Sequence, residues 1–78
     1  MSEHPVKAYV LAIVKRGTEH EIAKRIRKLE DVAEVLIVYG MWDIVIRIET
    51  ENLGKIDKII TDIRKLPEIE QTNTLIGA

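Results

Sequence analysis

The sequence lacks several features that define whole classes of proteins. It has no cysteine, so it can form neither disulfides nor thiolate metal sites. Its single serine is Ser2, in the polar first residues, which leaves no setting for a serine nucleophile. No apolar run approaches the roughly 18 residues of a membrane span, and the start does not resemble a signal peptide. We therefore expect a cytoplasmic protein without metal, cofactor or membrane partner.

Charge and length exclude further classes of protein. Twelve basic and thirteen acidic residues give the 78-residue chain a net charge of −1, which argues against a generally basic nucleic-acid binder. The four glycines are isolated from one another, so no glycine-rich phosphate loop is present. A chain of this length forms one domain at most and buries only about 60–65% of its unfolded surface. Such a small core gains stability from self-association.

The chain is rich in β-branched aliphatic residues and in charged residues of both signs. Isoleucine, valine and leucine number 26, and 20 of these are Ile or Val, whereas phenylalanine is absent. β-branched residues favour pleated sheet and an aliphatic core. Charged residues make up 32% of the chain and are mostly Lys, Glu and Arg, a mixture typical of the ion-paired surface of a thermophile's protein.

The hydrophobic pattern predicts four strands. The run 6–14 is apolar on both faces, which indicates a central strand. Residues 34–39 form a second strand, and Gly40-Met41 connects it tightly to a third over 42–50, where apolar and polar residues alternate. Residues 68–76 are more polar, as suits a strand at the edge of a sheet.

Two amphipathic helices separate these strands. Apolar residues recur at helical spacing over 19–29, where Thr18 and Glu21 match a capping box. A second helix covers about 52–65, and Pro67 stops it. The order of elements is therefore βαββαβ.

An internal repeat supports this order. Residues 26–29 (IRKL) recur as residues 63–66, and the same offset of 37 places Gly40 on Gly77. The chain therefore consists of two βαβ halves, whose right-handed crossovers place both helices on one face of the sheet. We expect one domain over residues 1–78 with an α+β, ferredoxin-like fold and an antiparallel sheet of strand order 4-1-3-2.

One face of this sheet has no helix to cover it. Because strand 6–14 is apolar on both faces, the open face still presents aliphatic side chains, which a lone monomer would expose to water. A homodimer through the open sheet faces is the simplest solution. An RNA surface is disfavoured, because the expected open face of strand 42–50 carries Asp43, Val45, Arg47 and Glu49, without an aromatic ring.

Two local features are candidates for a binding site. Asp43 begins a strand that otherwise consists of Ile and Val, directly after Gly40, and residues 72–74 form a Thr-Asn-Thr run. Each feature has a structural explanation, since glycine permits positive φ, aspartate bonds nearby amides, and edge strands are polar. A ligand site is the alternative, because a carboxylate can accept an ammonium group. His20 is interpreted as part of a solvated helix face, without a metal or catalytic role.

The pattern Gly40-Met41-Trp42-Asp43-Ile44-Val45-Ile46, followed by a helix and a short strand with Thr72-Asn73-Thr74, resembles the effector domain of Lrp/AsnC transcriptional regulators. This domain is called RAM, for regulation of amino acid metabolism. The family's hairpin usually reads Gly-x-Tyr-Asp, so Trp42 stands where tyrosine is usual. The resemblance covers residues 6–76, and the family's helix-turn-helix is missing from the sequence. The match is therefore to a stand-alone RAM domain.

The resemblance implies an amino-acid-sensing, oligomerising regulatory module that does not bind DNA itself. Family members dimerise through their sheets and assemble into rings, with a small effector, usually an amino acid, between dimers. Full-length Lrp/AsnC relatives are then possible partners through mixed assembly. The ligand-binding residues carried over by this resemblance are Gly40, Trp42, Asp43, Thr72 and Thr74.

Two other functions stay open from the sequence. One is a purely structural oligomer that binds no ligand. The other is a small enzyme of the dimeric α/β-barrel type, which would place polar side chains in a pocket against the sheet. Tyr9 and Arg47 are the residues available for that role, and neither has an obvious partner in the sequence.

Overall fold

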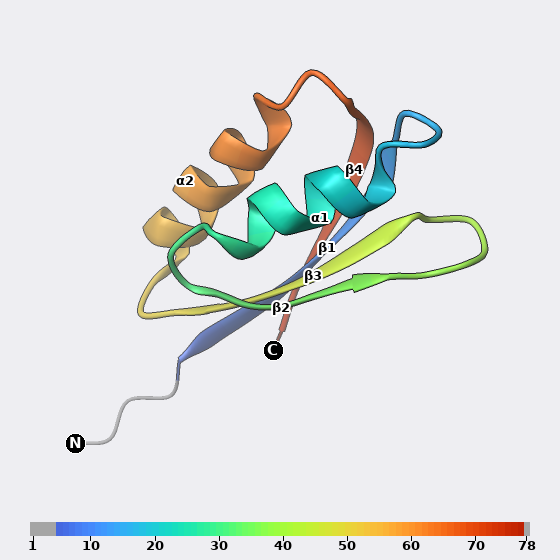
Figure 1. Cartoon of the computed structure of the whole chain (residues 1–78). Coiled ribbons are helices and arrows are strands. Elements are labelled where there is room, and N and C mark those ends of the chain that lie inside the picture. Colours follow the sequence, from blue (N-terminus) through green and yellow to red (C-terminus); the bar gives the residue numbers. More distant parts are fainter. Residues whose placement is uncertain (1–4, 78) are drawn as a thin grey trace.

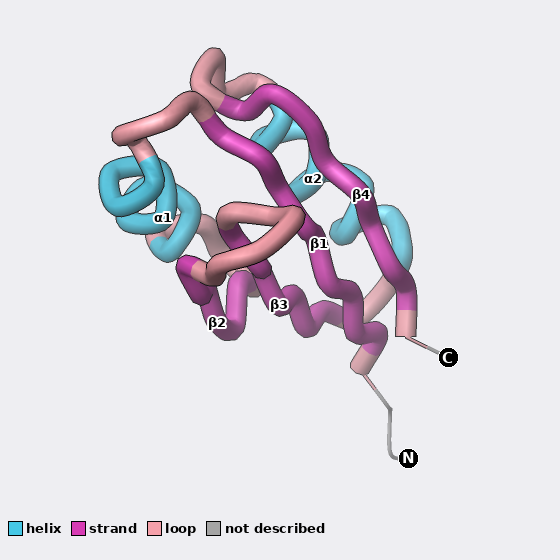
Figure 2. Tube along the Cα trace, turned by 90° about the vertical axis from the view of Figure 1, so that its right-hand side faces the viewer, coloured by secondary structure: helices cyan, strands magenta, loops and turns pink. Residues whose placement is uncertain are grey.

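The computed structural model describes residues 5–77 and places the doubly apolar first strand, β1 (Val6–Val14), inside a four-stranded sheet. Strand β3 (Ile44–Thr50) pairs with one side of β1 and β4 (Ile69–Ile76) with the other, both antiparallel. Strand β2 (Val32–Ile37) pairs antiparallel with the outer side of β3. The order β2-β3-β1-β4, visible in Figure 2, confirms the expected ferredoxin-like α+β fold.

Both helices cover the same face of the sheet (Figure 1). Helix α1 (Glu19–Arg27) and helix α2 (Leu53–Arg64) each bury one stripe of apolar residues against the strands. The core side chains of the helices are Ile22, Ala23, Ile26, Ile56, Ile59 and Ile63. No helix among the described residues is both long enough and apolar enough to cross a membrane.

The two helices begin in different ways. The side chain of Asn52 accepts a hydrogen bond from the Lys55 amide at 2.9 Å and so caps α2. The capping box predicted for α1 does not form, because Thr18 lies at φ −104° and ψ 5° rather than in the extended conformation of a capping residue. Its hydroxyl instead donates to the carbonyl oxygen of Lys15 at 2.6 Å.

The two faces of the sheet differ in burial. The side chains beneath the helices are completely or almost completely buried: Ala8, Val10, Ala12, Val14, Val35, Ile44, Ile46 and Ile48. On the open face, Tyr9 is 40% exposed, Leu36 47% and Leu75 51%. Arg47 lies on that open face and forms ion pairs with Glu34 and Glu49. The open face therefore combines apolar side chains with the charged cluster around Arg47 and with the polar residues Lys7, Gln71 and Asn73.

The boundaries of the hairpin differ from the sequence-based prediction. Strand β2 covers residues 32–37 instead of 34–39, and β3 begins at Ile44 instead of Trp42. The expected tight turn at Gly40-Met41 is instead a six-residue loop over 38–43. The Val38 amide closes it by donating to the carbonyl oxygen of Asp43 at 2.9 Å.

Candidate functional site

The loop over residues 38–43 presents both backbone and large side chains to solvent. Gly40 has φ +131°, a conformation that side chains rarely adopt, and the space where a Cβ would lie is open. Its neighbours Tyr39 and Met41 are almost completely exposed, at 101% and 83%. The backbone around Gly40 is therefore accessible to a small molecule.

Asp43 fixes this loop to the end of the central strand. Its backbone amide donates to the carbonyl oxygen of Ala12 at 2.9 Å. Its carboxylate Oδ2 accepts a hydrogen bond from the Val14 amide at 3.0 Å, across 29 positions of sequence. The bonded amide thus belongs to a neighbouring strand and not to the hairpin itself. A carboxylate has about four acceptor positions, so Asp43 retains capacity for another donor.

A hollow of about 380 Å³ lies between this loop and the start of α1. It is lined by Glu19 and His20 from α1 and by Ile37, Val38, Tyr39, Gly40 and Asp43 from the end of β2 and the loop. Binding pockets for small molecules typically start at about 300 Å³. Gly40 and Asp43 are thus brought together as the sequence predicts, whereas the half-buried Trp42 does not line the hollow.

The two predicted threonines lie elsewhere in the chain. Thr72 pairs with Ala12 and Thr74 with Val10, so both half-buried threonines lie on the helix-facing side of edge strand β4. Strand β1 separates β4 from β3, and two strand spacings amount to roughly 10 Å. A single chain therefore does not bring these threonines into the hollow.

The sequence reasoning missed Ile37, Val38 and Tyr39, which directly precede Gly40 in the chain, and also Glu19 and His20, which belong to another element. Glu19 and His20 form no recognisable motif with the hairpin, because they meet it only in the folded chain. The topology does contain a signal: β1 and β2 both run antiparallel to β3, so their carboxyl ends lie at the same end of the sheet. The segments that follow those two strands, the start of α1 and the loop 38–43, therefore meet there.

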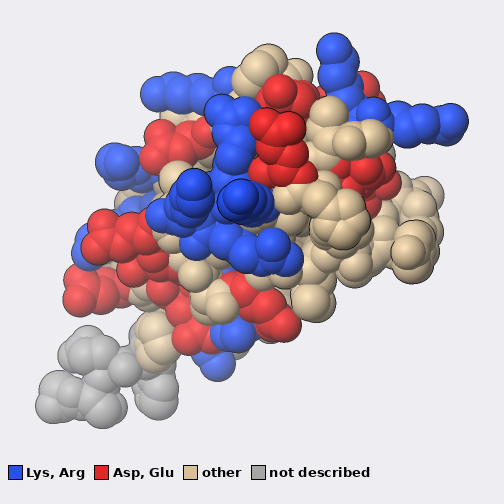
Figure 3. All heavy atoms as spheres, in the orientation of Figure 1, with Lys and Arg blue, Asp and Glu red and all other residues tan. Residues whose placement is uncertain are grey.

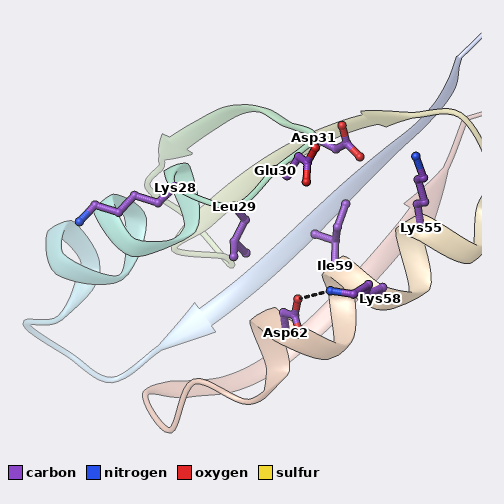
Figure 4. A pocket seen from close by; sticks show the side chains of 8 residues that line it. All are labelled: Lys28, Leu29, Glu30, Asp31, Lys55, Lys58, Ile59 and Asp62. Carbon is purple, nitrogen blue, oxygen red and sulfur yellow. Dashed lines mark ion pairs between the residues drawn. The ribbon is translucent and has the colours of Figure 1, made fainter.

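A second hollow, of about 330 Å³, lies between the end of α1 and helix α2 (Figure 4). Its charged groups largely pair with each other or with neighbours. Lys58 Nζ lies 3.5 Å from Asp62 Oδ2. The hydrogen bond from Lys55 Nζ to Glu51, 3.2 Å long, raises the pKa of Lys55 above its ordinary value. None of the predicted site residues lines this hollow, so we do not treat it as the candidate site.

On the face that Figure 3 shows, basic and acidic side chains of the described residues lie side by side. Figure 3 shows Lys and Arg side chains gathered over the helices, with acidic side chains beside them. Arg25 pairs with Glu68 at 3.8 Å, and Arg27 donates to the carbonyl oxygen of Val35 at 3.2 Å. Within residues 5–77, no three His, Asp or Glu side chains are grouped so that they could hold a metal ion.

Comparison with known families agrees with the fold. Residues 7–77 match the model of the Lrp/AsnC ligand binding domain. The chain belongs to this family. The matched range contains the whole sheet except the first residue of β1, both helices and all five predicted site residues. The chain is therefore a domain of regulatory type, related to Lrp/AsnC transcriptional regulators.

Individual relatives of this Lrp/AsnC domain are found among both longer and similarly short chains. The HTH-type transcriptional regulator FL11 of Pyrococcus abyssi is 33% identical over 69 residues, which cover 88% of this chain and 46% of that protein. The chain thus spans about half the length of the curated relatives it matches. The crystal structure of FFRP-DM1 is 36% identical, with a TM-score of 0.88, and the match covers 94% of this chain and 99% of that one. Hypothetical protein PHS023 from Pyrococcus horikoshii gives the same identity and TM-score, over 94% and 89%.

Proposed function

We propose that this Lrp/AsnC domain is an amino-acid-sensing, oligomerising regulatory module that is not an enzyme and does not bind DNA itself. The observation that carries the proposal is the hollow beside Gly40, which combines open backbone, an apolar wall and two carboxylates, Glu19 and Asp43. An amino acid presents an ammonium group that carboxylates accept through charge-assisted hydrogen bonds. Ile37 and Val38 provide contact for an aliphatic side chain.

The hollow is open to solvent on its outer side, so we propose that a second copy completes it. Thr72 and Thr74 of the same chain lie behind β1 and cannot reach the bound molecule. Supplied by a neighbouring protomer, their hydroxyls would add donors and acceptors to the site. Trp42, which belongs to the loop without lining the hollow, would form part of the same contact between copies. In this proposal, ligand binding and assembly favour each other.

The ligand is tested by thermal melting with a panel of the standard L-amino acids. A ligand at a hundredfold excess over its Kd stabilises the fold by about 2.7 kcal/mol. In a domain of this size that raises the melting temperature by roughly 10 °C or more. If no amino acid raises it, the domain is a structural oligomer without ligand and the sensing proposal is wrong.

Variants of Asp43 distinguish an effect on ligand binding from an effect on folding. Asp43→Asn keeps an acceptor for the Val14 amide but removes the negative charge, so we expect an unchanged melting temperature and a loss of amino-acid affinity of roughly 10- to 100-fold. Asp43→Ala removes both, and should in addition lower the free energy of unfolding by about 1–3 kcal/mol. Glu70→Gln, which neutralises an exposed carboxylate on β4, is the control and should change neither quantity. Unaltered affinity in Asp43→Asn would make Asp43 a purely structural residue.

We propose that the domain dimerises through its open sheet face. Tyr9, Leu36 and Leu75 are between 40% and 51% exposed there, and large apolar side chains exposed on one face often mark a protein–protein contact. Leu36→Asp should shift the mass in light scattering toward the 8.9 kDa monomer. The matched control is Leu53→Asp, because Leu53 is similarly exposed but lies on α2, away from the open face. A wild-type mass near 8.9 kDa at micromolar concentration would contradict the dimer.

The enzyme alternative gains no support from the open face. Tyr9 and Arg47 are cross-strand partners there, but Arg47 is already engaged by Glu34 and Glu49. Binding to DNA is tested by electrophoretic shift of duplex DNA. Because acidic residues interleave with the basic ones, we expect no shift below micromolar protein. Mixed assembly with full-length Lrp/AsnC regulators remains part of the proposal.

A further inference from the structure

The hollow beside the loop 38–43 is lined by more acidic than basic side chains. Glu19 and Asp43 contribute carboxylates, and Tyr39 contributes a phenol. His20 is the one side chain among the described lining residues that can carry a positive charge, since no lysine or arginine of that part of the chain lines the hollow. A role as the positively charged donor is therefore available to His20, which the sequence analysis placed on a solvated helix face.

The chemistry of an amino acid gives His20 a role, on the basis of the proposed function. A free α-amino acid is a zwitterion, so its recognition needs acceptors for the ammonium and a donor for the carboxylate. The acceptors are present, although each carboxylate already holds one amide: Glu19 that of Gly17 at 3.1 Å and Asp43 that of Val14 at 3.0 Å. His20 is the side chain that can supply a charged donor.

We propose that His20 is the specificity-determining residue of the hollow and that its imidazole donates a hydrogen bond to the carboxylate of the bound amino acid. Imidazole ordinarily gains its proton between about pH 8 and pH 5, a range in which free carboxylates remain charged. A protonated ring donates from both nitrogens and adds the attraction of unlike charges. Amino-acid binding therefore strengthens as the pH falls through this range.

The surroundings of His20 have charges of both signs. The charged or titratable groups that face or flank the imidazole are Glu19, Glu21, Lys24 and Arg25 on its own helix, Lys28 directly after it, and Tyr39 and Asp43 from the loop. Lys24 shares a separate shallow depression with His20 but does not line the hollow. It is therefore a suitable control position.

The test is calorimetric titration with two probes: the tightest-binding L-amino acid of the panel and its carboxamide, which keeps the ammonium and the side chain but has no carboxylate. Wild type should bind the amino acid roughly tenfold more tightly at about pH 6 than at about pH 8.5, and His20→Gln should not show this gain. At about pH 6, His20→Gln should lose roughly 10- to 100-fold in affinity for the amino acid and less than about twofold for the carboxamide.

Two further variants make the result decisive. His20→Lys carries a permanent charge, so it should keep the amino-acid affinity while losing most of the pH dependence. Lys24→Gln should change neither probe by more than about twofold. If wild type binds the amino acid and His20→Gln binds it equally well, the role of His20 is wrong and the proposed function stands. If wild type binds no amino acid of the panel, the proposed function is wrong, and the role of His20 with it.

Discussion

The two halves of the chain contain the same sequence repeat, but they differ in the length and cap of their helix and in the bonding of their final glycine. In the first half, α1 has nine residues, Thr18 does not cap it, and Gly40 stands in an open loop. In the second half, α2 has twelve residues and a side-chain cap. Gly77, the counterpart of Gly40, donates its amide to the carbonyl oxygen of Lys7 at 2.7 Å.

This difference shows which parts of the repeat the core constrains and which parts can vary between the halves. Both halves bury the same kind of isoleucine stripe, because the core of the sheet requires it from each helix. The hollow lies at the junction of the halves: six of its seven lining residues belong to the first half, and Asp43 belongs to the start of the second. A cap and a tethered glycine satisfy the backbone locally, whereas a site that binds a molecule leaves such groups accessible. Departures from local rules are expected at functional sites.

The largest effect should come from the positions that the halves share. Ile26 and Ile63 are equivalent in the repeat and both fully buried. Ile26→Ala and Ile63→Ala should each lower the free energy of unfolding by about 2–5 kcal/mol, since each leaves a cavity in the core. Urea denaturation measures both. If one variant loses less than about 1 kcal/mol, the halves do not contribute equally to the core.

A smaller effect should distinguish the two helix starts. Asn52→Ala removes the acceptor of the Lys55 amide and should cost about 0.5–2 kcal/mol. Thr18→Ala removes a hydroxyl that caps no helix amide, so its cost should stay below about 0.5 kcal/mol. Urea denaturation of the two variants side by side gives the comparison. Equal losses would mean that Thr18 does cap α1 in solution.

The smallest effect concerns two equivalent arginines. Arg27 donates to the carbonyl oxygen of Val35 in edge strand β2, and no such bond is found for Arg64 among the described residues. Arg27→Met should therefore cost about 0.5–1.5 kcal/mol and speed amide hydrogen exchange in β2. Arg64→Met should stay within about 0.5 kcal/mol of wild type. Similar exchange rates in the two variants would show that the Arg27 contact does not stabilise the strand.

The order of the elements could be predicted from the sequence, because periodicity, turn residues and Pro67 act locally. The end of β2 could not. Val38 and Tyr39 continue an apolar run, and nothing in the run shows that the chain leaves the sheet at Ile37, where the loop closed by Val38 and Asp43 begins. Burial depends on tertiary contacts, and Tyr39 makes too few to be buried.

The candidate site was only partly predictable for a related reason. Gly40 and Asp43 lie close in sequence, so a motif can reveal them together. Glu19 and His20 join them through the packing of α1 beside the loop, which leaves no short pattern. Thr72 and Thr74 do form a pattern, but the sheet places β1 between them and the loop. Sequence spacing alone does not show which residues share a surface in the folded chain.

The central position of β1 has a consequence for how the chain reaches this fold. In the sheet, Val6 of β1 pairs with Thr50 of β3, and Ala8 of β1 pairs with Ile76 of β4. Strand β1 is the first strand in the sequence and β4 the last, so both edges of β1 are paired only after β4 has been synthesised. Contacts between residues so distant in sequence slow folding, because a long loop must close before they form. Until β4 emerges from the ribosome, β1 keeps a bare edge that other chains can pair with. Pairing of β1 with β4 is therefore the last step in completing the sheet.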